Sequence, residues 1–218
     1  MKLESYLFKH IELLIKRYPV LENIKEDIIN GYLLMEECYL NGGKLLIAGN
    51  GGSAADAEHI AGELMKRFKL PRPVSNEFAE KLISIDKERG SQLAKNLECA
   101  LTAIPLVALE ALSTAYINDV DGLTVYAQQL MGFGRKGDVF LAISTSGNSK
   151  NVMNATVVAR ALGMKVLGLT GRKGGELASV ADITVKVPED ETYMIQELHL
   201  PIYHCWCLML EEKFFGNK

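Results

Sequence analysis

A hydroxyl-rich segment follows a short apolar run in the middle of the chain. Val139–Ser144 is predicted to be a buried strand, and it leads into Ser144-Thr-Ser-Gly-Asn-Ser149 and then a helix-period segment, Val152–Leu162. A strand that ends in hydroxyls and glycine at the start of a helix presents free N–H and O–H donors to one point. The segment therefore predicts an anion site, most often for phosphate. The alternative is a capped turn, but four hydroxyls in six residues exceed what one cap needs.

A carboxylate and an imidazole lie close together after the run Gly49-Asn-Gly-Gly-Ser53. His59 and Glu63 are four residues apart on a helix predicted over about Ala54–Phe68. This spacing places both side chains on one face, about 6 Å apart along the axis. The pair faces whatever the glycine-rich loop binds, which suits proton transfer or metal binding. An exposed His–Glu pair that only supports the helix, by a few tenths of a kcal/mol, is the alternative.

A third group, Gln196, His199 and His204, lies on the last predicted helix. Each side chain can bind a metal, and each histidine can move a proton, although a buried histidine is more often a core residue. Gln196 and His204 are about 12 Å apart along a straight helix, too far to bind one ion together. Either Pro201 kinks the helix between them, or the two serve different sites across a subunit boundary. Asn118-Asp119 is a further polar pair, which could cap a turn or hydrogen-bond sugar hydroxyls.

The elements that position these residues alternate between short apolar strands and helices. Two helices are predicted within residues 1–41, broken near Tyr18-Pro19, and a long helix over residues 193–215. The predicted strands are Lys44–Gly49, Leu106–Leu109, Val139–Ser144, Lys165–Thr170 and Ile183–Val187. This order predicts an α/β fold of one domain, residues 1–218, with a parallel sheet covered by helices on both faces. Both glycine- and serine-rich turns follow the carboxyl ends of strands, where such sheets bind ligands. Residues 75–103 are predicted to be a helical insertion.

The composition places the chain among ordinary proteins with a full core. It has 218 residues, of which 48% are hydrophobic and 23% charged, with a net charge of −3. The charge argues against nucleic-acid binding, and no apolar run reaches the roughly 20 residues that span a bilayer. The four cysteines form no CxxC pair and are expected to be reduced thiols. We expect a cytoplasmic protein without nucleic-acid or membrane partners.

The motifs resemble those of the sugar-isomerase (SIS) family. The resemblance is carried by Gly49-Asn-Gly-Gly-Ser53 with Asp56, His59, Glu63 and Arg67, by Ser144–Ser149, by Leu169-Thr-Gly171 with Gly174-Gly175, by Ala181-Asp182 and by Gln196-Glu197-x-His199. Within that family the pattern is similar to the phosphoheptose isomerases, which interconvert sedoheptulose 7-phosphate and D-glycero-D-manno-heptose 7-phosphate. The resemblance implies a five-stranded, flavodoxin-like parallel sheet, and a homotetramer with active sites at subunit interfaces.

The resemblance also implies a role for each site residue. The phosphate would be held by Ser144, Thr145, Ser146 and Ser149. The sugar would be contacted by Asn50, Gly51, Gly52, Ser53, Glu63, Arg67, Asn118, Asp119 and Gln196. One Zn²⁺ ion per subunit would be bound by His59, Glu63, Gln196 and His204.

Aldose–ketose isomerisation moves a proton between C1 and C2 through an enediol, so it needs a base and an acid. By resemblance, Glu63 is the expected base and His204 the expected acid. Two alternatives stay open: an isomerase of another sugar phosphate, or a non-catalytic SIS module that binds a sugar phosphate or a protein. Relatives that bind a replication initiator lack the acidic residue and the final histidine, and this chain has both, which favours catalysis.

Overall fold

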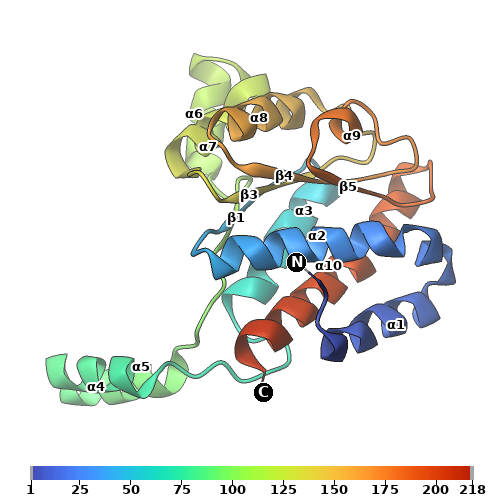
Figure 1. Cartoon of the computed structure of the whole chain (residues 1–218). Coiled ribbons are helices and arrows are strands. Elements are labelled where there is room, and N and C mark those ends of the chain that lie inside the picture. The colour runs from blue at the N-terminus through green and yellow to red at the C-terminus, as the bar shows by residue number, and fades with distance from the viewer. Residues whose placement is uncertain (1, 217–218) are drawn as a thin grey trace.

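Five short apolar strands form an all-parallel sheet at the centre of the molecule (Figure 1). The computed structural model describes residues 2–216, with the strands in the order β2-β1-β3-β4-β5. Their bounds are β1 Leu45–Ala48, β2 Ala103–Pro105, β3 Val139–Ile143, β4 Lys165–Thr170 and β5 Ile183–Lys186. From β1 the chain crosses to one side to form β2 and returns to the other side to form β3, so the strand order reverses between β1 and β3. This switch point is where open parallel sheets bind ligands.

Side chains alternate along each strand and feed two separate cores. Leu45 and Ile47 pack into one core with α1, α2, α3 and α10, whereas Leu46 and Ala48 pack into the other with α7, α8 and α9. The strands are therefore apolar throughout, as expected for a sheet covered on both faces. The helices are α1 Phe8–Arg17, α2 Lys25–Leu40, α3 Gly52–Met65, α4 Asn76–Ile85, α5 Lys87–Asn96, α6 Glu110–Asp119, α7 Val125–Phe133, α8 Lys150–Ala161, α9 Leu177–Val180 and α10 Thr192–Phe215, with 3₁₀ turns η1 Ser5–Leu7, η2 Pro19–Ile24 and η3 Gly122–Thr124. The predicted α/β class and parallel sheet are confirmed.

The prediction for the second strand is wrong by three residues. The strand lies at Ala103–Pro105. Leu106 still donates its N–H to the Ile47 carbonyl of β1 at 2.8 Å, and the rest of the predicted run leads into α6. β2 pairs only with β1 and forms an edge of the sheet. An edge strand tolerates Pro105, which has no N–H to donate, so the proline can lie within β2.

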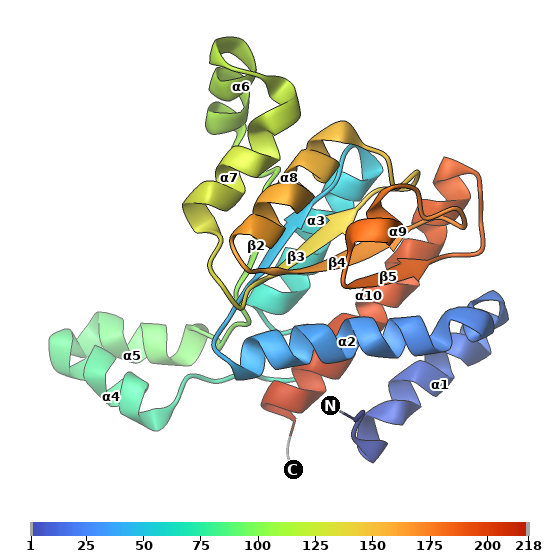
Figure 2. The same cartoon turned by 45° about the horizontal axis from the view of Figure 1, so that its top comes forward.

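The predicted insertion at 75–103 forms two antiparallel helices, α4 and α5, that project from the body as an arm (Figures 1 and 2). Ser75 caps α4 and Asp86 caps α5 through their side chains. The helices cross closely at Gly90, where a Cβ would lie 2.2 Å from the Leu82 carbonyl oxygen. No residue of α4 is buried. The arm therefore takes its shape from its own helix pair and not from packing on the body.

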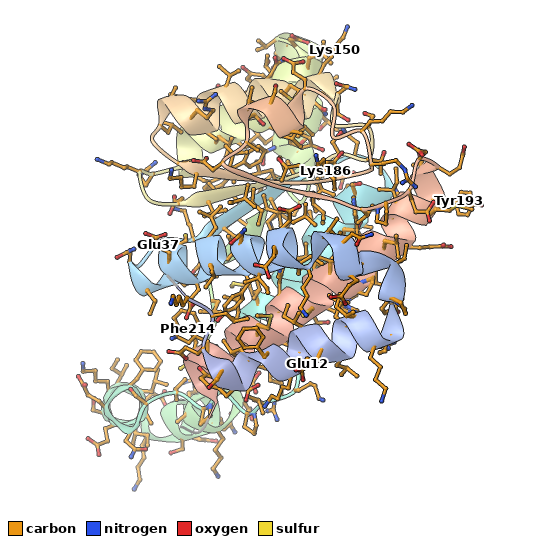
Figure 3. The ribbon with its side chains drawn as sticks, turned by 45° about the vertical axis from the view of Figure 1, so that its right-hand side comes forward. Glu12, Glu37, Lys150, Lys186, Tyr193 and Phe214 are labelled. Atoms are coloured by element: carbon orange, nitrogen blue, oxygen red, sulfur yellow. The ribbon has the colours of Figure 1, made fainter. Side chains whose placement is uncertain are left out.

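Helix α10 runs the length of the molecule beside α1, α2 and α3. Figure 3 labels Tyr193 near its start and Phe214 near its end. The helix continues through Pro201 without a break. Within residues 2–216, no helix is long and apolar enough to cross a membrane.

Candidate active site

The two predicted binding loops lie side by side at the carboxyl edge of the sheet. They follow β1 and β3, which are neighbours in the sheet (Figure 2). The side-chain amides of Asn50 and Asn151 exchange hydrogen bonds of 2.9 and 2.8 Å and so join the first loop to α8. The buried hydroxyl of Tyr126 donates to the Gly49 carbonyl at 2.7 Å and supports the first loop from below. The structure thus brings together the two segments that the sequence singled out.

The segment 144–149 holds its hydroxyls in an open turn at the start of α8. The Oγ atoms of Ser144 and Ser149 lie 2.9 Å apart, and Ser146 Oγ accepts the N–H of Asn148 at 3.1 Å. Ser149 precedes α8 but its side chain caps none of the helix N–H groups. Val152 N–H donates to the Asn151 side chain at 3.0 Å, whereas the N–H groups of Lys150 and Asn151 remain available. The twelve residues of α8 have aligned dipoles that favour an anion here.

A glycine turn closes the far side of this loop. Gly147 has φ +67°, and a Cβ there would lie 2.0 Å from the Gly174 carbonyl oxygen, so only glycine fits. A cavity of about 210 Å³ lies beside the turn, bordered by Thr145, Ser146, Arg172 and Lys173 among others. Two hydroxyls and two cationic side chains border this cavity, but Glu189 and Asp190 border it too, and Asp190 pairs with Arg172 at 3.0 Å. The features suited to a phosphoryl group are therefore the hydroxyl turn and the start of α8, not the charge of the cavity.

The first loop packs against the start of α10. Gly51 has φ +56°, which turns the chain sharply into α3. A Cβ at Gly52 would lie 2.6 Å from Gln196 Nε2, so the Gln196 amide rests directly on the loop backbone. Ser53 is buried against Gly49. Gln196 therefore belongs with the glycine loop.

A cluster of three titratable side chains forms two turns further along α3. His59 Nε2 lies 3.3 Å from Glu63 Oε1 and 3.3 Å from His204 Nε2. Because α3 and α10 pack together, the carboxylate and the imidazole, distant along the chain, meet around one nitrogen atom. Lys66 Nζ lies 3.4 Å from the other Glu63 oxygen and keeps positive charge near the carboxylate.

Two further side chains extend this cluster, and the sequence did not single them out as site residues. The Tyr203 hydroxyl lies 3.1 Å from both Asp56 Oδ1 and His59 Nδ1. Burial raises the pKa of Asp56, while the Tyr203 hydrogen bond and His59 oppose the shift. Asp56, His59 and Glu63 follow i, i+3, i+7 spacing, which could have revealed the face of α3; no comparable signal marked Tyr203.

His204 lies between this cluster and an open groove. Burial and the neighbouring His59 lower the pKa of His204, while Glu63 opposes the shift. On its other side, a cavity of about 270 Å³ separates α10 from α1, with His204, His10 and Arg17 on its walls. The imidazole is thus partly desolvated yet reachable.

The third residue of the α10 group, His199, belongs to the core. It is fully buried, and its ring nitrogens make no hydrogen bond of ordinary geometry. Burial lowers its pKa to about 4, an effect that the Thr170 backbone only partly offsets. His199 is therefore neutral at physiological pH.

Three predicted site residues lie apart from both loops and from the cluster. The Arg67 guanidinium forms an ion pair with Glu98, and its backbone N–H donates to the same carboxylate at 2.9 Å. Asn118 and Asp119 form the exposed end of α6 and bond to each other at 2.9 Å. Among the described residues, no hydrogen bond or ion pair joins these three to the other predicted site residues.

The expected zinc ligands only partly come together. Zinc prefers four N, O or S donors in a tetrahedron, which spaces neighbouring donors by about 3.3 Å. The two separations around His59 Nε2 have this length, and the two histidines and Glu63 are chemically suitable donors. Gln196 lies at the glycine loop instead, and residues 2–216 contain no group of three or more His, Cys, Asp or Glu side chains arranged to hold a metal ion. The donor chemistry suits zinc, but one chain does not enclose an ion.

A five-stranded parallel sheet with two binding loops at its switch point is the arrangement of one protein class, the SIS domain. A family model described as "SIS domain" matches residues 8–100 and 93–171. The phosphoheptose isomerase of Aneurinibacillus thermoaerophilus is 36% identical over 99% of this chain and 98% of that protein.

Two solved structures are similar over nearly the whole chain. The phosphoheptose isomerase of Neisseria gonorrhoeae has a TM-score of 0.72 and 31% identity, and that of Francisella tularensis has 0.74 and 29%. In both cases the match covers 97% of this chain and 100% of the other. The chain belongs to the phosphoheptose isomerases, a family of sugar-phosphate isomerases built on the SIS domain. The predicted family and enzyme class are confirmed.

Proposed function

We propose that this enzyme interconverts sedoheptulose 7-phosphate and D-glycero-D-manno-heptose 7-phosphate through an enediol. One observation carries the residue assignment: Glu63 Oε1 and His204 Nε2 each lie 3.3 Å from His59 Nε2. The relatives' names support the substrate. The cluster begins seven residues along α3 from Gly52, about 10 Å by helix rise, so the reacting carbons would lie beyond the glycine loop.

The phosphate end of the substrate binds the hydroxyl turn. Ser144, Thr145, Ser146 and Ser149 donate hydrogen bonds together with the free N–H groups of α8. Asn50, Gly51, Gly52, Ser53 and Gln196 border the sugar from the glycine loop. Arg67, Asn118 and Asp119 remain proposed sugar contacts, and they act either after rearrangement or toward a neighbouring subunit.

The reacting end requires a base and an acid. Glu63 takes the proton from C2 of the aldose, or from C1 of the ketose, and returns it to the other carbon. His204 donates a proton to the carbonyl oxygen and recovers it from the neighbouring hydroxyl. Burial and the neighbouring His59 lower the pKa of His204, which makes its protonated form a stronger acid toward the carbonyl oxygen. Proton transfer between positioned groups of this kind contributes about 10²- to 10⁴-fold in rate.

A zinc ion is the proposed cofactor, with His59, Glu63 and His204 as ligands; because Gln196 of the same chain lies at the glycine loop, the fourth ligand would be a Gln196 supplied by a neighbouring subunit. When bound, it would polarise the substrate carbonyl as a Lewis acid. The support is the donor set and its spacing around His59.

We further propose a cytoplasmic homotetramer with active sites at subunit interfaces. The cysteines are free thiols, as a reducing compartment requires. Neither α4 nor α6 buries any of its residues, and both present exposed apolar side chains such as Ile85 and Ile117. The groove beside His204 is an open cavity, into which a neighbouring subunit could place side chains.

A substrate panel tests the function. Purified protein is assayed with five-, six- and seven-carbon sugar phosphates, each with and without a chelator. We expect turnover of sedoheptulose 7-phosphate above all others and its loss on chelation. Preference for a shorter sugar would identify an isomerase of another sugar phosphate, and binding without turnover would identify a non-catalytic module. Turnover unaffected by the chelator would exclude zinc as the cofactor.

A further inference from the structure

A line of hydrogen bonds leads from the half-buried carboxylate of Asp56 to the cluster. Asp56 Oδ1, the Tyr203 hydroxyl and His59 Nδ1 follow one another at 3.1 Å steps. Tyr203 is 1% exposed, so water does not compete for its hydroxyl. The second Asp56 oxygen is buried and makes no hydrogen bond. Tyr203 is therefore the hydrogen-bond donor on which the Asp56 carboxylate depends.

The number of protons fixes the direction of these bonds. A tyrosine hydroxyl donates one hydrogen bond, whereas an ionised carboxylate only accepts. If the hydroxyl donated to His59, Asp56 Oδ1 would face an oxygen lone pair with no donor in reach, and unmade bonds to buried charged groups are costly. The hydroxyl therefore donates to Asp56 and accepts from His59. His59 must then carry its proton on Nδ1.

In the neutral imidazole, which carries a single N–H, this arrangement leaves the other ring nitrogen of His59 unprotonated. The bare Nε2 is the atom that lies 3.3 Å from both Glu63 Oε1 and His204 Nε2. We propose that Tyr203, held by Asp56, is a positioning residue that fixes the tautomer and ring orientation of His59. Its Nε2 lone pair is thereby directed to the point shared with Glu63 and His204. Histidines that serve as metal ligands are commonly oriented by such a bond from their second nitrogen.

The packing around the ring allows this role to be separated from a structural one. The Tyr203 ring meets the His59 and His204 rings edge-on, with centroids 5.4 and 5.0 Å apart. Tyr203→Phe keeps these contacts and removes only the hydroxyl. Tyr39→Phe is the matched control, because it also removes a buried tyrosine hydroxyl, one that donates to the Thr102 carbonyl at 3.1 Å away from the cluster.

The tautomer can be read directly by NMR on the full-length protein labelled with ¹⁵N-histidine. Long-range ¹H–¹⁵N correlations should show a protonated Nδ1 and an unprotonated or metal-bound Nε2 for His59 in the wild type. Asp56→Asn keeps an oxygen acceptor and should keep this tautomer. Asp56→Ala frees the hydroxyl to donate to His59 and should move the proton to Nε2, while Tyr203→Phe should abolish the preference. An unchanged His59 tautomer in both Asp56→Ala and Tyr203→Phe would overturn the proposal.

Kinetics provides a second readout, which rests on the proposed function. Tyr203→Phe should lower kcat by about 10- to 100-fold at unchanged KM, the usual range for partners of metal-binding histidines. Tyr39→Phe should retain wild-type kcat. A wild-type kcat in Tyr203→Phe would count against the proposal. If the wild type turned over no sugar phosphate, the proposed function would fail, and the NMR comparison would still decide the role of Tyr203.

Discussion

Proton transfer by two side chains is the central proposal at the scale of single residues. Glu63→Gln removes the base and His204→Ala removes the acid, so each should lower kcat by about 10²- to 10⁴-fold. Phosphate binding should persist, because the hydroxyl turn belongs to a different loop. Steady-state kinetics on the preferred substrate, with inorganic phosphate binding measured separately, checks both expectations.

Glu58→Gln is the matched control for the base. Glu58 lies on the same helix, is exposed, and undergoes the same change of carboxylate to amide. Its kcat should equal that of the wild type. Near-normal turnover in Glu63→Gln or in His204→Ala would show that the acid and base have been wrongly assigned.

His199 makes a residue-scale contribution to the pH dependence of stability. Its pKa is about 4 in the folded protein and about 6.5 when exposed, so the unfolded chain binds the extra proton between these values. Stability is therefore lost as pH falls below 6.5, by about 2 kcal/mol at pH 5 and about 3 kcal/mol in full. Urea unfolding of the wild type and of His199→Gln at pH 7 and pH 5 measures how much unfolding free energy each protein loses on acidification. The variant should lose less stability on acidification, and equal losses in both proteins would contradict the assignment.

Residue spacing revealed side chains that share a helix, whereas only the family resemblance placed His204 at the same site as His59 and Glu63. His59 and Glu63 were predicted as a pair because their four-residue spacing alone places them on one face. The contact of His204 with His59 depends on how α3 and α10 pack, which no local pattern encodes. Tyr203 was missed for the same reason, since a tyrosine amid apolar residues is indistinguishable from an ordinary core residue.

The hydroxyl turn before α8 acts as a unit at the scale of an element. The double variant Ser146→Ala, Ser149→Ala removes two hydroxyl donors and should raise KM by at least about tenfold, because hydrogen bonds to a charged group contribute roughly 1.5–3 kcal/mol each. kcat should change less, since these donors hold the end of the substrate that does not react. Ser91→Ala, which removes an exposed hydroxyl on the arm, should leave both constants unchanged. A double variant that lowered kcat at constant KM would place the turn at the reacting end.

Elements with a strong internal pattern were predicted well, and those defined by their neighbours were not. β4 was predicted with its bounds, and β1, β3 and β5 to within a residue or so, because buried parallel strands are continuous apolar runs. β2 was misplaced because its position depends on pairing with β1 and because an edge strand admits Pro105. Of the two explanations offered for Gln196 and His204, the unbroken α10 is consistent with separate locations, one at the glycine loop and one at the cluster.

At the scale of the whole molecule, two helical elements are not packed into either hydrophobic core. The arm and α6 project from the body, and neither α4 nor α6 has a buried residue (Figure 2). Apolar side chains on such elements are expensive to leave in water when they form a continuous surface. The sequence could predict the arm's helices from their caps and periodicity, but not what lies against them, because assembly depends on a second chain.

Ile85→Glu tests whether the arm belongs to the proposed tetramer interface. Ile85 is 83% exposed in the single chain, so a glutamate there should alter the stability of an isolated subunit by no more than about 0.5 kcal/mol. In an interface the same carboxylate would be desolvated without a partner, which is costly, and the tetramer should dissociate into smaller species. Ser84→Glu adds the same charge at the neighbouring exposed position, on a different side of α4, and should leave the assembly intact. Light scattering over a range of protein concentrations measures the mass of each variant. An unchanged mass for Ile85→Glu would exclude the arm from the interface, and a monomeric wild type would contradict the proposed tetramer.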